Sequence, residues 1–345
     1  FKPPKEFFHM FSTSKFFCSF IYCMIDTRPT RAVLLCSTLL LPGVLTKKMD
    51  FRINDYLGRI GLDTTTNRPT DLNTLTSIMA AHSRTIPFEN IDVVLGKNIS
   101  MRDDDVATKL VNNKRGGYCF EQNTLLRLAL VSLGYKVRPL LCRVRWGKTD
   151  DQISAFTHVA LAVSFPDIAV NTEYLVDVGF AGTNSVAPVL LKQTPEGQPQ
   201  TLPEGQFRVV PISSHDGNGN YTGLQMYNRK KWKSLYIFRT NETAVEPDLT
   251  ASNWLSCTYP SARFTNQFFA SIVVSDVERH HILNDTYVIR NLLKDEDKSS
   301  TAVTMKITNV EQLIELLDTV FGLDFTDSGS GEYKNLGRYL TSECE

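Results

Sequence analysis

A cysteine, a histidine and an aspartate stand where they could form a nucleophilic site. Cys119 follows the basic, glycine-rich stretch KRGGY and directly precedes a segment whose apolar residues recur at helical spacing. The first turn of a helix has unpaired N–H groups and the positive end of the helix dipole, which favour an anion. Cysteine pKa values fall at such positions, so a thiolate there would be a nucleophile. A small, buried and inert cysteine is the alternative interpretation.

The glycines before Cys119 have an expected role of their own. Gly116 and Gly117 separate the basic residues from the cysteine, and glycine lets a backbone turn without steric cost. We therefore expect a turn that leads into the cysteine helix, with Gly134 as the C-cap at its other end.

A base and a group to orient it lie on two consecutive segments with strand-like sequence. His158 belongs to FTHVALAVSF, where alternation puts it on one face with two alanines. Asp177 interrupts the apolar segment EYLVDVGF, and a carboxylate inside such a strand is costly unless it is paired. If the strands form a hairpin, Asp177 can hold one imidazole N–H and leave the other nitrogen facing a thiol. Each residue alone could be structural; the three together would fit papain-like nucleophilic catalysis.

The overall composition is that of a globular protein without a dominant charge. The 345 residues are 42% hydrophobic, and 37 basic residues balance 37 acidic ones. A balanced chain has no net field to attract nucleic acid or a membrane surface, so neither is an expected partner of the body. His280 and His281 have no further ligands at metal spacing, and no metal is expected.

Residues 1–48 are apolar and aromatic-rich, unlike the rest of the chain. The run 32–45 is too short for a comfortable transmembrane helix and has the length of a signal-peptide core, with Arg28 and Arg31 before it. The stretch MDFRINDYLGRIGL, from Met49, reads like a natural protein start. An upstream extension or mistranslated leader is our preferred interpretation, and a targeting segment is the second.

The cysteines indicate a reducing compartment. Of seven, three lie in residues 1–48 and four are widely separated in the body: Cys119, Cys142, Cys257 and Cys344. This spacing shows no disulfide framework, so a cytoplasmic location is expected.

The order of elements after the leader predicts an α+β protein. Helical spacing prevails to about residue 135, strand-like segments with an expected antiparallel sheet or barrel follow to about 245, and the remainder is mixed. The segment 87–96 reads as extended or looped after Pro87. Further expected elements are helices over 70–86, 103–113, 247–259 and 309–323, and strands over 269–276, 280–293 and 301–307.

Four motifs, IPFENIDV, RGGYCFEQN, FTHVALAV and YLVDVGFAG, closely resemble the arylamine N-acetyltransferase family in their order and spacing. The resemblance covers essentially Met49 to the C-terminus, and residues 1–48 have no counterpart. After the leader or upstream extension (1–48), which is not part of the fold, the resemblance implies a papain-like arrangement of a helical domain carrying the nucleophile (49–135), a β-barrel domain carrying His and Asp (136–245) and an α/β lid (246–345).

The resemblance implies a triad of Cys119, His158 and Asp177 used for acyl transfer. Cys119 would take an acetyl group from acetyl-CoA as a thioester and pass it to the nitrogen of an arylamine or arylhydrazine, as in xenobiotic metabolism. His158 would move the protons and Asp177 would fix its tautomer. A monomer is favoured, and the acyl group could be acetyl, propionyl or malonyl.

Residues around the triad are expected to form an ion pair or to line the substrate cleft. Glu89 should be partly buried and therefore needs a cation, for which Arg115 is the expected partner; the resemblance implies the same pairing. It also implies that four residues line the substrate cleft, namely Phe88 and Phe180 at the acceptor pocket and Ala155 and Thr157 along the acyl-CoA side. Plain core packing is the alternative for the two phenylalanines.

Two other functions stay open at this point. A cysteine hydrolase (a peptidase, deamidase or transglutaminase-like enzyme) could use the same triad, because fold and triad alone do not fix the reaction. A catalytically silent binding protein is less favoured, since all three triad residues are present.

Removal of residues 1–48 is expected to leave soluble protein with full acetyl-transfer activity, because the helical pattern begins at Met49. The check compares the two chains by size-exclusion chromatography and by acetylation of an arylamine. A truncated protein that aggregates or loses activity would contradict the assignment of this segment as a leader.

Overall fold

The structure, a computed structural model, describes the chain in nine stretches. These are residues 51–149, 152–166, 172–183, 185–192, 194, 197–213, 220–292, 303–325 and 332–340. Every described residue belongs to the unit formed by residues 48–345. The expectations for residues 1–48 and for Cys344 lie outside the described residues.

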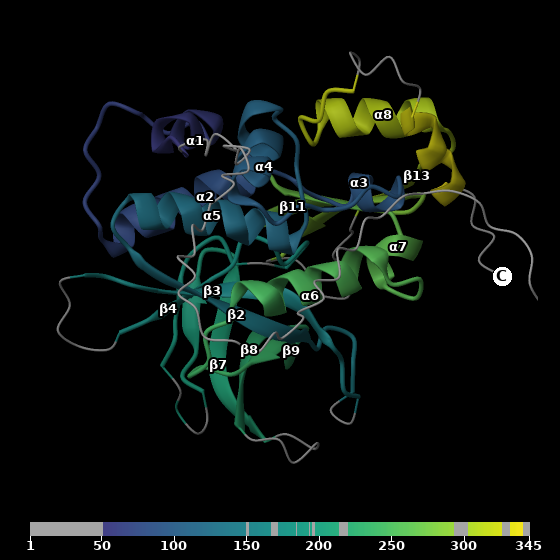
Figure 1. Ribbon diagram of the computed structural model, residues 1–345. Coiled ribbons are helices and arrows are strands. Elements are labelled where there is room, and N and C mark those ends of the chain that lie inside the picture. Colours follow the sequence, from purple (N-terminus) through teal and green to yellow (C-terminus); the bar gives the residue numbers. More distant parts are fainter. Residues whose placement is uncertain are drawn as a thin grey trace, which may run out of the picture. The chain divides into compact units, whose positions relative to one another are not determined.

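The early helices form where apolar spacing predicts them (Figure 1). Asp71 caps α2: its carboxylate accepts a hydrogen bond from the Thr74 N–H at 2.8 Å. Gly134 follows the end of the cysteine helix with φ of 89°, the left-handed conformation of a glycine cap. The elements are α1 (Ile53–Arg59), α2 (Leu72–Thr85), α4 (Asp103–Ala107), its π-helical continuation η1 (Thr108–Asn112) and α5 (Cys119–Ser132).

Two stretches differ from their sequence-based predictions. The segment 87–96, expected to be extended or looped, contains the short extended strand β1 (Phe88–Glu89) but also a helical turn that was not expected, α3 (Ile91–Val94). The segment 280–293 is not one strand but part of a hairpin that turns at Asn284, whose φ is 52°. Asparagine tolerates this left-handed conformation, which the apolar pattern alone does not reveal.

The largest element is an eight-stranded antiparallel sheet, in the order β5-β4-β3-β2-β9-β8-β7-β6. The antiparallel sheet expected from the strand-like segments is present, and its strands β5 and β6 are too short to show a period in the sequence. The strands are β2 (Lys136–Val144), β3 (Phe156–Ser164), β4 (Tyr174–Val176), β5 (Val189–Leu190), β6 (Gln200–Leu202), β7 (Gly205–Ser213), β8 (Asn220–Asn228) and β9 (Lys231–Phe238).

The Gln200 side chain joins the two edges of this sheet. Its Nε2 donates to the Leu190 carbonyl at 2.9 Å, and its Oε1 accepts from the Leu190 N–H at 2.7 Å. The amide therefore takes the place of the backbone pairing that is absent between β5 and β6, and the sheet is a nearly closed barrel.

β3 lies between two cores because its side chains alternate. Ala160 and Ala162 face the barrel interior with Phe207 and Phe238, whereas Leu161 and Val163 face a helical core built by α1, α2 and α5. This alternation, expected from the sequence, attaches the cysteine helix to the outer face of the barrel.

The C-terminal part forms a five-stranded sheet, in the order β1-β10-β11-β12-β13, with α8 packed on it. Because β1 pairs with β10 and Phe88 also bridges to Gly117, the loop before Cys119 is joined to the C-terminal sheet. The three-domain division at residues 135 and 245 stays a prediction. The elements are α6 (Glu246–Thr258), α7 (Arg263–Asn266), β10 (Phe269–Val273), β11 (Glu278–Leu283), β12 (Thr286–Asn291), β13 (Val303–Lys306), α8 (Val310–Thr319) and the 3-10 helix η3 (Glu332–Tyr339).

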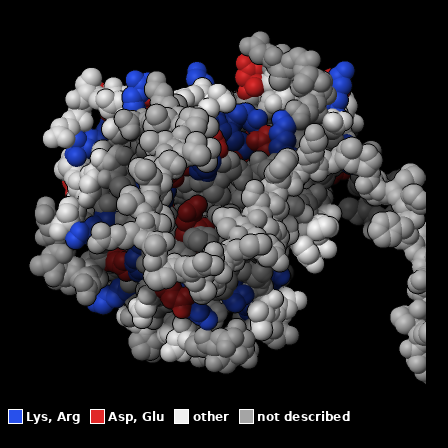
Figure 2. Space-filling model, in the orientation of Figure 1, with Lys and Arg blue, Asp and Glu red and all other residues white. Residues whose placement is uncertain are grey.

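The surface carries both signs of charge. On the face in Figure 2, Lys and Arg side chains alternate with Asp and Glu side chains instead of gathering into one field. Within the described part of the chain, no helix is both long and apolar enough to cross a membrane.

Gln200→Leu is expected to lower the free energy of unfolding by about 1–2 kcal/mol, because the Leu190 N–H and C=O lose their partners. Urea denaturation measures the difference. Gln198→Leu is the matched control, since Gln198 is exposed and lies outside the strands. Equal effects of the two changes would contradict a role for Gln200 in closing the barrel.

Candidate active site

Cys119 is the first residue of α5, and its helix start is capped from within. The Tyr118 N–H donates to Glu121 Oε2 at 3.0 Å, the return bond of a capping box. Cys119 is only 2% exposed, and its sulfur lies 3.8 Å from the Thr157 carbonyl oxygen. The helix-start position predicted from the sequence is confirmed.

The two glycines before Cys119 serve a different purpose from the one expected. Neither has a positive φ, so the turn itself does not require them. A Cβ on Gly116 would lie 2.6 Å from Glu89 Cγ, and one on Gly117 would lie 2.7 Å from Glu121 Oε2. Glycine is required here because the chain passes close to two buried carboxylate side chains.

Gln122 holds the loop before Cys119 in place through hydrogen bonds. Its Nε2 donates to the Pro87 carbonyl at 2.7 Å and the Gly117 carbonyl at 3.2 Å, and its Oε1 lies 2.6 Å from His82 Nε2. Burial lowers the pKa of His82 to about 4 even though this contact with Gln122 opposes it. His82 is therefore neutral near pH 7, and the loop is held without adding a charge beneath Cys119.

His158 and Asp177 lie side by side behind Cys119. β3 and β4 pair antiparallel, with Leu161 opposite Val176, and Asp177 follows the end of β4. His158 Nε2 lies 2.7 Å from Asp177 Oδ2, and the Cys119 sulfur is close enough to help raise the pKa of the same imidazole. Because Asp177 occupies Nε2, Nδ1 is the nitrogen left for the thiol. The structure thus brings the three residues together in the expected order.

The surroundings of His158 favour its charged form. Burial by itself lowers the pKa of this imidazole, but the Asp177 carboxylate and the Cys119 sulfur outweigh burial and raise the pKa to about 10. His158 is consequently an imidazolium near pH 7. An imidazolium beside a cysteine is the partner that a thiolate requires.

The remaining lone pairs of Asp177 are also occupied. Oδ1 accepts from the Gly179 N–H at 2.8 Å and from Asn123 Nδ2 at 2.9 Å. Asn123 was not among the residues predicted for the site, although it stands four residues after Cys119 and so on the same helix face. The available signal was the spacing, which puts a polar side chain one helical turn after the cysteine.

Two aromatic rings enclose the imidazole. The centroid of Phe180 lies 5.2 Å from that of His158, and the centroid of Tyr236 lies 4.9 Å from it. Burial, followed by the negative charge of Asp177, raises the pKa of Tyr236 well above its usual value, so its hydroxyl stays protonated. That hydroxyl makes no hydrogen bond within the described part of the chain. The rings exclude water from one side of the His158–Asp177 pair.

A buried network of charges lies under the loop that leads to Cys119. The expected pair is present, with Arg115 Nη2 at 2.9 Å from Glu89 Oε1. The network extends further than the sequence suggested, because Lys109 Nζ lies 2.6 Å from Asp92 Oδ2 and 2.7 Å from Glu121 Oε1. Since Glu121 also caps α5, these ion pairs connect the helix start to β1 and η1.

A cavity of about 1070 Å³ opens onto Cys119 and His158. All four residues expected at the substrate cleft line it: Phe88, Ala155, Thr157 and Phe180. Two more aromatic residues, Phe264 and Phe269, lie against Phe88 with ring centroids 5.8 and 5.6 Å away. No Asp or Glu is among the described residues that line the cavity, whereas Lys148 and Arg263 are.

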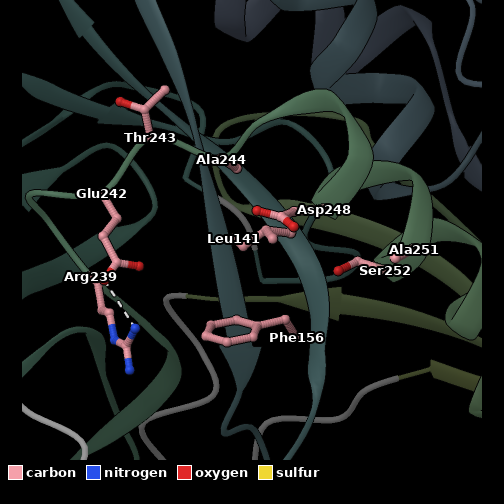
Figure 3. Close-up of a pocket in the computed structure, with 9 residues that line it drawn as sticks. All are labelled: Leu141, Phe156, Arg239, Glu242, Thr243, Ala244, Asp248, Ala251 and Ser252. Carbon is pink, nitrogen blue, oxygen red and sulfur yellow. Dashed lines mark hydrogen bonds and ion pairs between the residues drawn. The ribbon is translucent and has the colours of Figure 1, made fainter.

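A second cavity, of about 340 Å³, lies between α6 and the strands β2 and β3. Figure 3 shows Leu141 and Phe156 on its strand side, Asp248 and Ser252 on α6, and an ion pair of Arg239 with Glu242 at its edge. None of Cys119, His158 and Asp177 lines it. Among the described residues, no group of three or more His, Cys, Asp or Glu side chains could hold a metal ion.

Comparison with known proteins agrees with this geometry. A family model described as N-acetyltransferase matches residues 71–329. The arylamine N-acetyltransferase of Mycolicibacterium smegmatis is 33% identical over 282 residues, which are 81% of this chain and 94% of the relative. A solved structure of the M. smegmatis enzyme matches with a TM-score of 0.75 and 30% identity, covering 85% of this chain and 100% of that one.

A further solved structure is that of Mycobacterium marinum arylamine N-acetyltransferase in complex with CoA. It matches with a TM-score of 0.72 and 29% identity, covering 84% of this chain and 98% of that one. Fold and family model together define an acyl-transferring enzyme, an N-acetyltransferase. More specifically, the chain belongs to the arylamine N-acetyltransferase family.

Arg115→Met is expected to lower the free energy of unfolding by about 3–5 kcal/mol, because it leaves the buried Glu89 carboxylate without its cation. Arg127→Met is the control: Arg127 pairs with Asp103 at a similar 2.8 Å, but the two side chains are 31% and 50% exposed, and surface pairs contribute about 0–1 kcal/mol. Urea denaturation of both variants checks the difference. Similar losses would contradict a supporting role for the Glu89–Arg115 pair.

Proposed function

We propose that this protein transfers an acetyl group from acetyl-CoA to the nitrogen of an arylamine or arylhydrazine through a thioester on Cys119. The observation that carries the proposal is the hydrogen bond of His158 with Asp177, in a site where His158 and Cys119 together line a cavity large enough for two substrates. The arrangement is that of a papain-like triad, used here for acyl transfer.

In the first half-reaction, the Cys119 sulfur attacks the carbonyl carbon of acetyl-CoA. The new S–C bond forms a tetrahedral intermediate, whose collapse breaks the bond from carbon to the CoA sulfur. The His158 imidazolium gives its proton to the departing CoA thiolate, so free CoA leaves and acetyl-Cys119 remains. The Cys119 N–H, at the start of α5, is a candidate donor to the developing oxyanion.

In the second half-reaction, the amine nitrogen attacks the thioester carbonyl carbon. His158, now neutral, accepts the amine proton, and the bond from carbon to the Cys119 sulfur breaks to release the N-acetylated product. Asp177 keeps Nε2 of the imidazole occupied throughout, so the same nitrogen always faces the sulfur. Arylamines and hydrazines are weak bases and are uncharged near pH 7, which leaves their lone pair ready to attack.

The cavity supports both substrates. Phe88, Phe264 and Phe269 offer aromatic surfaces on which an arylamine ring could pack. Lys148 and Arg263, in a lining without described carboxylates, suit the phosphate groups of CoA. The M. marinum relative solved with CoA supports this choice of donor. A cytoplasmic location and a monomeric state accompany the proposal as expectations.

A cysteine hydrolase remains the second candidate, because the same three residues can activate water. What favours the transferase is membership of the family together with the cationic lining of the cavity, which a peptide or amide substrate would not require. A hydrolase would turn over amide substrates and leave CoA esters unused.

Initial rates at several fixed concentrations of an arylamine are expected to give parallel double-reciprocal lines in acetyl-CoA, the pattern of a covalent intermediate. Without acceptor, mass spectrometry should find one acetyl group on the Cys119 peptide. The peptides of Cys142 and Cys257 serve as internal controls, since neither of these thiols lines the cavity. Cys119→Ser should lose the adduct and at least about 100-fold in rate. Intersecting lines with no acetyl-Cys119 would refute the covalent route.

A further inference from the structure

Three separate segments supply the triad, and one side chain contacts all of them. Cys119 begins α5, His158 lies on β3, and Asp177 follows β4. Asn123, one helical turn beyond Cys119, is fully buried where these segments meet.

Each hydrogen-bonding atom of the Asn123 amide is used. Nδ2 donates to the Val159 carbonyl, next to His158, at 2.8 Å. It also donates to Asp177 Oδ1 at 2.9 Å. Oδ1 accepts from the Val178 N–H at 3.2 Å. The amide thus connects the helix of the nucleophile to the strand of the base and to the segment of the acid.

The packing around Asn123 leaves no freedom for that acid segment to shift. A Cβ on Gly179 would lie 2.6 Å from Cys119 Cα and 2.9 Å from Asn123 Nδ2. The stretch Asp177–Gly179 is therefore in direct backbone contact with the first turn of α5. The position of this stretch is therefore set by Cys119, through backbone contact, and by Asn123, through hydrogen bonds.

We propose that Asn123 is a positioning residue that sets the orientation of Asp177, and through it the tautomer and position of His158 relative to Cys119. The inference rests on the proposed function, because it assigns the residue to the acyl-transfer site. Asn123 touches neither a substrate nor the sulfur in this role; it acts through Asp177.

Asparagine is the residue type that this position requires. Its two N–H groups reach two acceptors while its oxygen accepts from a backbone N–H. Leucine has a similar volume but would leave the Val178 N–H and the Val159 carbonyl unpaired in the interior. Aspartate keeps the acceptor but adds a negative charge beside Asp177, and it regains a donor only when it is protonated.

The test uses Asn123→Leu and Asn123→Asp in the full chain and follows the alkylation of Cys119 by iodoacetamide as a function of pH. In the parent protein, alkylation should be fast at neutral pH, and its plateau should extend toward the pH at which His158 loses its proton, near 10. Asn123→Leu should slow alkylation about tenfold or more at pH 7 and end the plateau at lower pH. The rate for Asn123→Asp relative to Asn123→Leu should rise as the pH falls, because the introduced carboxyl group, once protonated, could donate to Asp177 again.

Asp71→Ala is the control for a purely structural loss. It removes the cap of α2, a hydrogen bond that does not touch the site, and should lower thermal stability without moving the alkylation profile. If Asn123→Leu behaves like this control, with a lower melting temperature and an unchanged profile, the inference is wrong. If Asn123→Leu does not fold, Asn123→Asp and Gly179→Ala decide, and parent-like profiles in both would overturn the inference.

The outcomes also separate this inference from the proposed function. Alkylation of the parent protein at the slow rate of an ordinary thiol would show that Cys119 is not activated. Fast alkylation of the parent with no effect of the Asn123 variants would leave the transferase proposal standing and reject only the positioning role. Fast alkylation that the variants slow, in a protein that does not use acetyl-CoA, would keep the positioning role and reject the transferase.

Discussion

The first turn of α5 is packed so closely that three neighbouring positions have no space for a β-carbon. Gly116 and Gly117 approach buried carboxylate side chains, and Gly179 lies against the backbone of Cys119. Close approach of this kind fixes where the nucleophile stands relative to β1 on one side and to the Asp177 segment on the other. The barrel, the early helices and the C-terminal sheet each provide residues that pack around this turn. The site therefore depends on all three.

Charge is arranged around this turn in two separate groups. The Glu89–Arg115 pair and the Lys109 contacts lie beneath the loop, where they hold the helix start and the loop in place. The second group is the imidazole of His158 with Asp177, enclosed by Phe180 and Tyr236. Low exposure strengthens both groups, because water does not compete for their hydrogen bonds. Only the second group opens, through His158, onto the cavity.

The cavity links this geometry to the family. Aromatic rings lie near the sulfur, and the described lining carries basic residues but no carboxylates. Such a lining suits a planar, uncharged acceptor and a phosphate-bearing donor. It also explains why membership of the arylamine N-acetyltransferase family and the physical character of the site lead to the same reaction class.

The sequence by itself determined the local features of this protein. Features that depend on contacts between residues close in the chain are revealed by spacing. They are the helix start at Cys119, the cap by Asp71, the helix end at Gly134 and the alternation of β3. The ion pair of Glu89 and Arg115 could also be predicted from the sequence, since a buried carboxylate requires a cation.

Only the tertiary structure decided which contacts form between segments that are distant in the chain. The edge-to-edge closure by Gln200, the Lys109 contacts with Asp92 and Glu121, and the three hydrogen bonds of Asn123 join residues that no local pattern relates. The need for glycine at 116, 117 and 179 likewise comes from neighbours in space, because their backbone conformations would accept other residues. Interactions of this kind depend on how helices and strands pack, and packing is set by the whole chain at once.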